Sequence, residues 1–153
     1  MKRYYLAYGS NLNVRQMKYR CPTAKIVGTA VIRDYELLYK GSKTGSYLTI
    51  EKKKGSLVPV AVWEVTATDE HSLDIYEGYP NFYYKKNMKI RLSKTGKTVD
   101  AFVYIMHEER RLGIPTSAYV STCKYGYTIF GFDFKYLDEA YEKSLKGASN
   151  NEN

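Results

Sequence analysis

The chain has 153 residues, of which 44% are hydrophobic, and a formal net charge of +8. This length suits one compact domain with a sizeable core and is too short for two ordinary domains. The amino-terminal apolar stretch breaks at Gly9, unlike a signal peptide, and no later stretch reaches the roughly 20 apolar residues of a membrane span. We therefore expect a single domain over residues 1–145 that is cytoplasmic and has no membrane partner.

Metal-ligating residues are sparse in this sequence. Cys21 and Cys123 are too few for a disulfide framework and have no CxxC or zinc-finger spacing. His71 and His107 stand apart from each other and from the cysteines, outside any HExxH pattern. This pattern predicts a protein of a reducing compartment without a metal site. We expect both histidines at the surface or in capping positions.

The positive charge is distributed in short lysine clusters at 52–54, at 85–86 and at Lys94 with Lys97. A basic surface attracts anions, including nucleic acid. Lysines beside turns and at strand edges, however, are typical of solvated positions that prevent sheets from associating. We therefore do not expect nucleic acid to be a partner despite the net charge.

In chain order, the first strand runs from Arg3 to Tyr8 and ends at Gly9, and Asn11 or Asn13 can cap a helix that follows. Alternation of apolar and polar residues, and turn signals such as Gly55-Ser56, predict about six strands. These strands cover residues 3–8, 24–39, 47–51, 58–65, 82–92 and 98–106, with a loop at 41–45 and a turn at 93–96.

The predicted helices lie between and after these strands. After the helix that ends near Arg20, Thr68 can cap a short helix that ends at Gly78, and Thr116 can cap a third. A fourth covers 134–145, and residues 146–153 lack an apolar pattern, which predicts a disordered tail. Strands interrupted by short helices favour an α+β fold over a doubly wound parallel sheet.

Glu77 is the first candidate for chemistry. Leu73, Tyr76 and Glu77 share one helix face, which we expect to be buried. Burial and the partial negative charge of the helix end at Gly78 should both raise the pKa of Glu77, which suits a general base. A purely structural role, as a helix cap or in an ion pair with Lys85 or Lys86, is an open alternative.

The second candidate is the turn that joins the first strand to the first helix. Backbone N–H groups at such a junction can bind an anionic or polarised ligand. Gly9 allows close approach of the backbone, and Ser10 and Asn11 add short polar side chains. Taken alone, a Gly-Ser-Asn sequence is common in structural loops and does not indicate a binding site.

Taken together, these motifs resemble the γ-glutamylcyclotransferase-like family (AIG2-like). The resemblance rests on Tyr8-Gly9-Ser10-Asn11-Leu12, on Leu73-Asp74-Ile75-Tyr76-Glu77-Gly78-Tyr79-Pro80 and on Tyr84, and it spans about residues 4–141. It implies a small mixed β-barrel flanked by short helices. It also implies an enzyme that needs no cofactor, acts on a small γ-glutamyl substrate and releases 5-oxoproline.

Carried over residue by residue, the resemblance implies that Glu77 is the general acid/base. The substrate-binding residues implied are Tyr8, Gly9, Ser10, Asn11, Leu12, Tyr84 and Tyr119.

The sequence departs from the family at two positions. Lys86 stands where many relatives have arginine, and Asn11 stands where the glutathione-directed branch typically has leucine. The resemblance therefore points away from that branch. A relative that cleaves γ-glutamylamines tends to carry a different residue pair after Tyr-Gly, so Ser10-Asn11 favours γ-glutamyl amino acids or a similar acyl group as substrates. Alternatives are a γ-glutamylamine cyclotransferase, a non-catalytic basic binding module and a regulatory relative with a degenerate site, although the presence of Glu77 disfavours the last.

Overall fold

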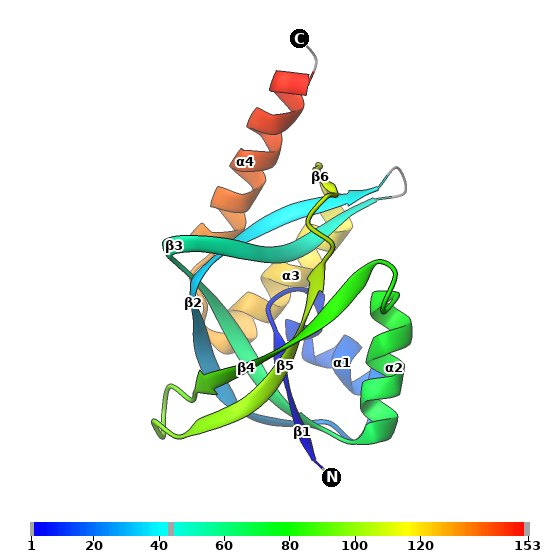
Figure 1. Cartoon of the computed structure of the whole chain (residues 1–153), viewed down its shortest axis with the longest axis vertical. Coiled ribbons are helices and arrows are strands. Elements are labelled where there is room, and N and C mark those ends of the chain that lie inside the picture. The colour runs from blue at the N-terminus through cyan, green and yellow to red at the C-terminus, as the bar shows by residue number, and fades with distance from the viewer. Residues whose placement is uncertain (1, 43–44, 152–153) are drawn as a thin grey trace.

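The structure is a computed structural model that describes residues 2–42 and 45–151. Six strands form one mixed sheet, curved into a half-barrel, with helices packed around it (Figure 1). The strands are β1 (Arg3–Ala7), β2 (Lys25–Ser42), β3 (Gly45–Val65), β4 (Tyr83–Arg91), β5 (Thr98–Met106) and β6 (Arg111–Leu112). The helices are η1 (Ser10–Leu12, a 3-10 turn), α1 (Val14–Arg20), α2 (Ala67–Glu77), α3 (Ser117–Phe130) and α4 (Lys135–Asn151).

The sheet has the strand order β4-β5-β1-β3-β2-β6. β1 lies in the centre, antiparallel to β3 and parallel to β5, which makes the sheet mixed. The first half of β2 curls back toward the end of β4, where Ala30 bridges Leu92 and Ser93 N donates to Thr29 O at 2.9 Å. The α+β class and the small mixed barrel expected from the sequence are therefore confirmed.

The β2–β3 hairpin is longer than the sequence indicated. We predicted two strands separated by a turn at Gly55-Ser56, but β3 is continuous and pairs with β2 along most of its length. The register shifts between Arg33 and Tyr35, where Gly55 has φ 87° and its N–H donates to Asp34 Oδ1 at 2.9 Å. Gly55 therefore forms an irregularity that bends the hairpin, because a left-handed glycine can absorb extra residues without ending the strand.

The tip of this hairpin also differs from the sequence prediction of a loop at 41–45. Gly41 pairs with Ser46, and Ser42 pairs with Gly45, as part of the ladder. Residues 43–44 lie outside the described part of the chain. The two-residue strand β6, which the sequence did not predict, pairs with Lys40 and Gly41 at the edge of the sheet.

The helix caps fix where α1 and α2 begin. Asn13, one of the two predicted candidates, accepts a hydrogen bond from Gln16 N at 3.2 Å and caps α1. Thr66, and not the predicted Thr68, caps α2, because Thr66 and Asp69 exchange two reciprocal hydrogen bonds of 3.1 Å in a capping box. The helix ends at Gly78 as predicted, where φ is 62°.

The part of the chain after β6 is helical, as the sequence predicted, with Thr116 as the cap of α3. α4 continues to Asn151, although we predicted a disordered tail from Lys146, and it projects away from the barrel (Figure 1). Residues 152 and 153 lie outside the described range. Across residues 2–42 and 45–151, no helix combines the length and the apolar character needed to cross a membrane.

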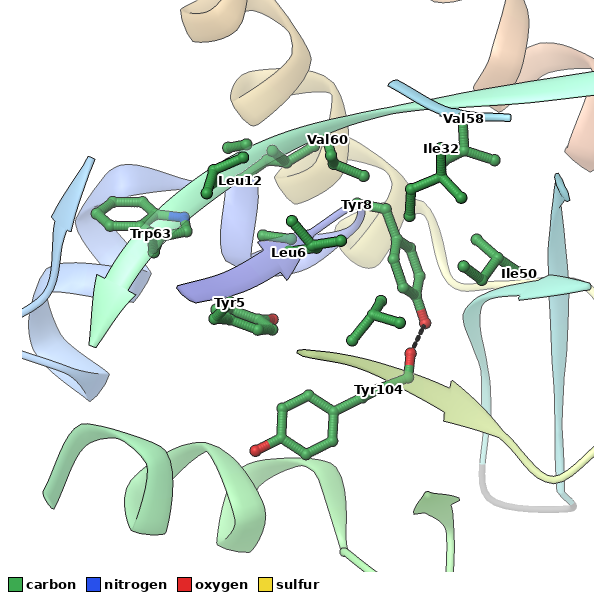
Figure 2. Packing of buried hydrophobic residues seen from close by; sticks show 14 of the residues in the cluster. Tyr5, Leu6, Tyr8, Leu12, Ile32, Ile50, Val58, Val60, Trp63 and Tyr104 are labelled. Carbon is green, nitrogen blue, oxygen red and sulfur yellow. Dashed lines mark hydrogen bonds between the residues drawn. The ribbon is translucent and has the colours of Figure 1, made fainter. Parts of the chain in front are cut away.

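The core fills the inside of the half-barrel with aliphatic and aromatic side chains. Leu6 and Val60 from neighbouring strands are fully buried there, beside Tyr8 (Figure 2). Tyr8 Oη donates to Tyr104 O at 2.7 Å, which satisfies a hydroxyl that would otherwise destabilise the core. The Tyr104 ring points from β5 toward α2. Together with Tyr5 and Tyr8, it makes this end of the barrel rich in tyrosines.

Candidate active site

A cavity of about 510 Å³ lies at the tyrosine-rich end of the barrel. Its walls come from the loop after β1, the last turn of α2 and the start of β4 with the residue before it, and from side chains of β1, β3, β5 and α3. The lining includes residues 8–11, residues 75–78, Tyr47, Leu48, Phe82 and Tyr83, together with Tyr5, Tyr104 and Tyr119. The two motifs singled out in the sequence, some 65 residues apart, therefore meet at one cavity.

The loop after β1 forms one wall of the cavity. Leu12 N donates to Gly9 O at 3.0 Å, which closes the η1 turn directly after the strand. A Cβ atom on Gly9 would lie 3.4 Å from Tyr119 Oη and 3.5 Å from Leu48, both of which line the same cavity. Glycine at this position therefore keeps space free where the backbone faces the cavity.

The back of the loop packs on α3. Leu12 is fully buried, and a Cβ atom on Gly126 would lie 2.4 Å from Leu12 Cβ and 2.6 Å from Leu12 C. Gly126 thus lets α3 approach the loop closely enough to support it from behind. Leu12 itself does not line the cavity, so the structure gives it a packing position and not the substrate-facing one that the resemblance implied.

An ion-pair network holds α2 against the sheet. Lys85 Nζ lies 2.6 Å from Glu70 Oε2 and 2.8 Å from Asp74 Oδ1, and Tyr104 Oη donates to Asp74 Oδ1 at 2.6 Å. Arg3 Nε pairs with the other oxygen of Glu70 at 2.6 Å. These contacts join β1, β4 and β5 to the helix that carries Glu77.

Glu77 is the last residue of α2, is half-buried and lines the cavity. Within residues 2–42 and 45–151 it forms no ion pair, because Lys85 is engaged with Glu70 and Asp74 instead. Burial raises the pKa of Glu77 to about 8, and the positive charge of Arg20 opposes that rise. An ion pair with Lys85 or Lys86, one of the two structural alternatives for Glu77, therefore does not form among the described residues.

The helix face around Glu77 is less buried than we predicted. Leu73 is fully buried, but Tyr76 is 43% exposed. The Tyr76 hydroxyl nevertheless turns toward the loop, where it shares a hydrogen bond of 2.9 Å with Ser10 Oγ. The periodicity therefore identified one core residue of this face, while Tyr76 lies at the wall of the cavity.

Most of the predicted substrate-binding residues meet at the cavity, but Tyr84 does not. Its hydroxyl points elsewhere and donates to the Glu108 carboxylate. The preceding residue, Tyr83, lines the cavity instead and donates from Oη to Leu48 O at 2.8 Å. Because successive side chains of a strand point to opposite faces, only one of these two tyrosines can face inward.

Tyr119 lies at the cavity as predicted, and its Oη accepts a hydrogen bond from Leu48 N at 3.0 Å. Sequence reasoning missed several of the other aromatic residues in the lining, because it placed them in predicted strands and gave them no further role. They are Tyr5, Tyr47, Phe82, Tyr83 and Tyr104. The number of aromatic residues in these strands was the available signal, but the strand register that brings them together is not visible in the sequence.

The charge and composition of the cavity suit a small organic ligand. Glu77 is the only acidic residue in the described lining, and the rest is aromatic, aliphatic or neutral polar. Among residues 2–42 and 45–151, no three His, Cys, Asp or Glu side chains are grouped as metal ligands. The fold and the cavity together thus define a half-barrel domain with a pocket of small-molecule size.

Comparisons with known proteins agree with this description. The sequence model of the family described as γ-glutamyl cyclotransferase, AIG2-like, matches residues 5–121. A human γ-glutamylcyclotransferase is 31% identical over 110 residues, which are 67% of this chain and 58% of the human protein. This chain therefore belongs to the γ-glutamyl cyclotransferase, AIG2-like family.

Solved structures show the same fold. A structure described as γ-glutamyl cyclotransferase superimposes with a TM-score of 0.81 at 25% identity, covering 92% of this chain and 86% of that one. An uncharacterised human protein superimposes with a TM-score of 0.80 at 26% identity, covering 91% and 86%. YkqA from Bacillus subtilis shares the fold alone, with a TM-score of 0.77 at 16% identity over 94% of this chain and 54% of that protein.

Proposed function

We propose that this protein cyclises γ-glutamyl compounds into 5-oxoproline and a free amine, with Glu77 as the general acid/base. The observation that carries the proposal is the position of Glu77. Its half-buried carboxyl group has a pKa raised to about 8 and faces the same 510 Å³ cavity as the Gly9–Asn11 loop. Membership of the γ-glutamyl cyclotransferase family supports this reading of the site.

The reaction is an intramolecular aminolysis. The α-amine of the substrate attacks its own γ-amide carbonyl carbon, a C–N bond closes the five-membered ring, and the original C–N amide bond breaks. Glu77 accepts the proton that the attacking amine loses and delivers it to the leaving nitrogen, so atoms and charge balance without a cofactor. A pKa of about 8 brings the basicity of the Glu77 carboxylate closer to that of an amine than the basicity of an ordinary glutamate, which favours proton transfer between them.

The loop supplies candidate donors for the carbonyl oxygen, which gains negative charge during ring closure. The N–H groups of Leu12 and Asn13 are used within the turn, at 3.0 Å each to Gly9 O and Ser10 O. Among the described hydrogen bonds, the N–H groups of Ser10 and Asn11 have no protein acceptor. A well-aimed donor of this kind contributes about 3 kcal/mol to stabilising an oxyanion.

The aromatic walls favour ring closure in a second way. Three aromatic side chains form part of the cavity wall: Tyr47 and Phe82, whose ring centroids are 6.2 Å apart, and Tyr119. A closed apolar wall shapes a flexible γ-glutamyl chain into a folded conformer, and proximity of this kind accounts for a large part of many intramolecular rate enhancements. Ser10 and Asn11 in the loop favour γ-glutamyl amino acids as the substrate class.

The test is to incubate the purified protein with γ-glutamyl amino acids, γ-glutamylamines and glutathione, and to measure 5-oxoproline. We expect turnover of γ-glutamyl amino acids, while preferred release of simple amines would assign the alternative γ-glutamylamine activity. Glu77→Gln should reduce kcat by about 100-fold to 10,000-fold, the usual contribution of a general acid/base.

Glu109→Gln, the same carboxyl-to-amide change at an exposed position, is the matched control and should retain parent activity. If Glu77→Gln is folded and turns over as fast as the parent, the assignment of the base is wrong. If none of the substrates yields 5-oxoproline, the proposed activity itself fails.

A further inference from the structure

Arg20, in the last turn of α1, touches both of the motifs that form the cavity. Its guanidinium donates to Asn11 Oδ1 in the loop after β1. The same group lies over the ring of Tyr76, with Cζ 3.4 Å from the ring centroid, in the last turn of α2. Arg20 Nη2 also donates a long hydrogen bond of 3.5 Å to Gln16 Oε1, one turn earlier on α1.

The groups that Arg20 contacts are themselves fixed in orientation. Asn11 Nδ2 donates to Tyr5 Oη at 2.9 Å, so both atoms of the Asn11 amide are bonded when Arg20 occupies the oxygen. Across the cavity wall, Tyr76 Oη and Ser10 Oγ share a hydrogen bond of 2.9 Å. Arg20 and this single hydrogen bond therefore join the loop to the last turn of α2.

Arg20 is also distinctive in its charge. The titratable groups that face Glu77 from the strands and from α3 are tyrosines, and burial raises the pKa of each of them, so they remain neutral. They are Tyr5, Tyr8, Tyr83, Tyr104 and Tyr119. Arg20 stacks on Tyr76, the residue before Glu77, and its positive charge opposes the rise in the Glu77 pKa. Within the described residues, Arg20 has no carboxylate partner of its own.

We infer that Arg20 is a positioning residue for the proposed base, holding the loop against the last turn of α2 and directing a positive charge toward the Glu77 carboxyl group. This inference rests on the proposed function for its catalytic meaning, but the contacts stand on their own. A planar guanidinium can stack on Tyr76 and donate to Asn11 at the same time, whereas a lysine ammonium provides only a compact charge. Charge and geometry can therefore be separated by substitution.

The test compares three variants. Arg20→Gln removes the positive charge, and Arg20→Lys keeps the charge but loses the planar guanidinium group. Lys18→Gln is the matched control, because it removes an exposed positive charge from the same last turn of α1. The first readout is a ¹³C NMR titration of carboxyl-labelled glutamates, with the Glu77 signal assigned by its loss in Glu77→Gln. The second readout is kcat and KM for 5-oxoproline formation.

We expect Arg20→Gln to move the Glu77 titration to higher pH by about one unit, since an opposite charge nearby typically lowers a carboxyl pKa by one to three. Arg20→Lys should leave the titration near that of the parent but lower kcat/KM by about tenfold, because Asn11 and Tyr76 lose their shared partner. Lys18→Gln should change neither readout, because solvent and salt screen an exposed charge.

An unchanged Glu77 titration in Arg20→Gln would overturn the electrostatic part of the inference. If Arg20→Gln does not fold, Arg20→Lys still decides, because parent-like kcat/KM in that variant would overturn the positioning role. Absence of 5-oxoproline with every substrate, together with a shifted Glu77 titration in Arg20→Gln, would reject the proposed function and leave the Arg20–Glu77 coupling in place.

Discussion

Replacing Glu77 by glutamine should make the protein relatively more stable as the pH rises. The pKa of Glu77 is raised from 4.5 to about 8 in the folded state by burial. Between these two values the folded state binds more protons than the unfolded state, so the free energy of unfolding falls as pH increases. The glutamine variant lacks this titration and should not show this part of the decrease.

The magnitude follows from the two pKa values. At 1.36 kcal/mol for each pH unit, a rise from 4.5 to about 8 removes about 4 kcal/mol from the parent between pH 5 and pH 9. This figure is an upper bound, because Glu77 is only half-buried and water can solvate its charged form in part. We expect a measured change of at least about 1 kcal/mol.

The assay is urea unfolding of the parent and of Glu77→Gln at a series of pH values from 5 to 9. The quantity of interest is the difference between the two free energies of unfolding, because every other titrating group cancels in it. A hydrogen bond gained or lost by the amide shifts this difference by a constant and leaves its slope unchanged. A difference that stays flat over this range would refute the claim that Glu77 is desolvated.

Two further substitutions test how the loop is held. Gly126→Ala should destabilise the protein by about 1–3 kcal/mol, because the new Cβ atom would overlap Leu12. Gly28→Ala is the control and should be close to neutral, since no atom lies within 4 Å of its new Cβ. Equal urea unfolding midpoints for the two variants would contradict this packing. Tyr76→Phe removes the hydrogen bond to Ser10 and should lower the unfolding free energy by about 1 kcal/mol and raise KM for the γ-glutamyl substrate. An unchanged KM would show that this bond does not order the loop.

The sequence was sufficient to predict those parts of the candidate site that depend on a short stretch of neighbouring residues. A glycine between a strand and a helix and a glutamate at a helix end are readable patterns, and both lie at the cavity. Leu12 shows that not every residue of a family motif has to share the position of its neighbours at the cavity. Its neighbours in the loop face the cavity, but the tight η1 turn directs Leu12 into the core against Gly126.

The alternation of side chains along β4 explains why Tyr84 does not line the cavity. Both Tyr83 and Tyr84 suit a strand, and the sequence contains no signal that distinguishes the inward from the outward residue. Which tyrosine faces inward depends on the register in which Tyr83 pairs with Met106 and Tyr84 with Ile105. A shift of this register by one residue would move every side chain of the strand to the other face of the sheet. The same dependence on pairing concealed the bend at Gly55, which looked like a hairpin turn from local composition alone.

Residues that act between elements are the hardest to find from sequence, and Arg20 is the clearest example here. At the end of a short helix, a basic residue is ordinarily explained by the helix dipole or by solvation. Its contacts with Asn11 and with the distant Tyr76 become visible only after β1, α1 and α2 are placed around one cavity. Because Tyr76 precedes Glu77, any change in the stacking of Arg20 acts on the helix turn that carries the proposed base. The two motifs that are separate in the sequence are therefore coupled in the structure by a residue that belongs to neither.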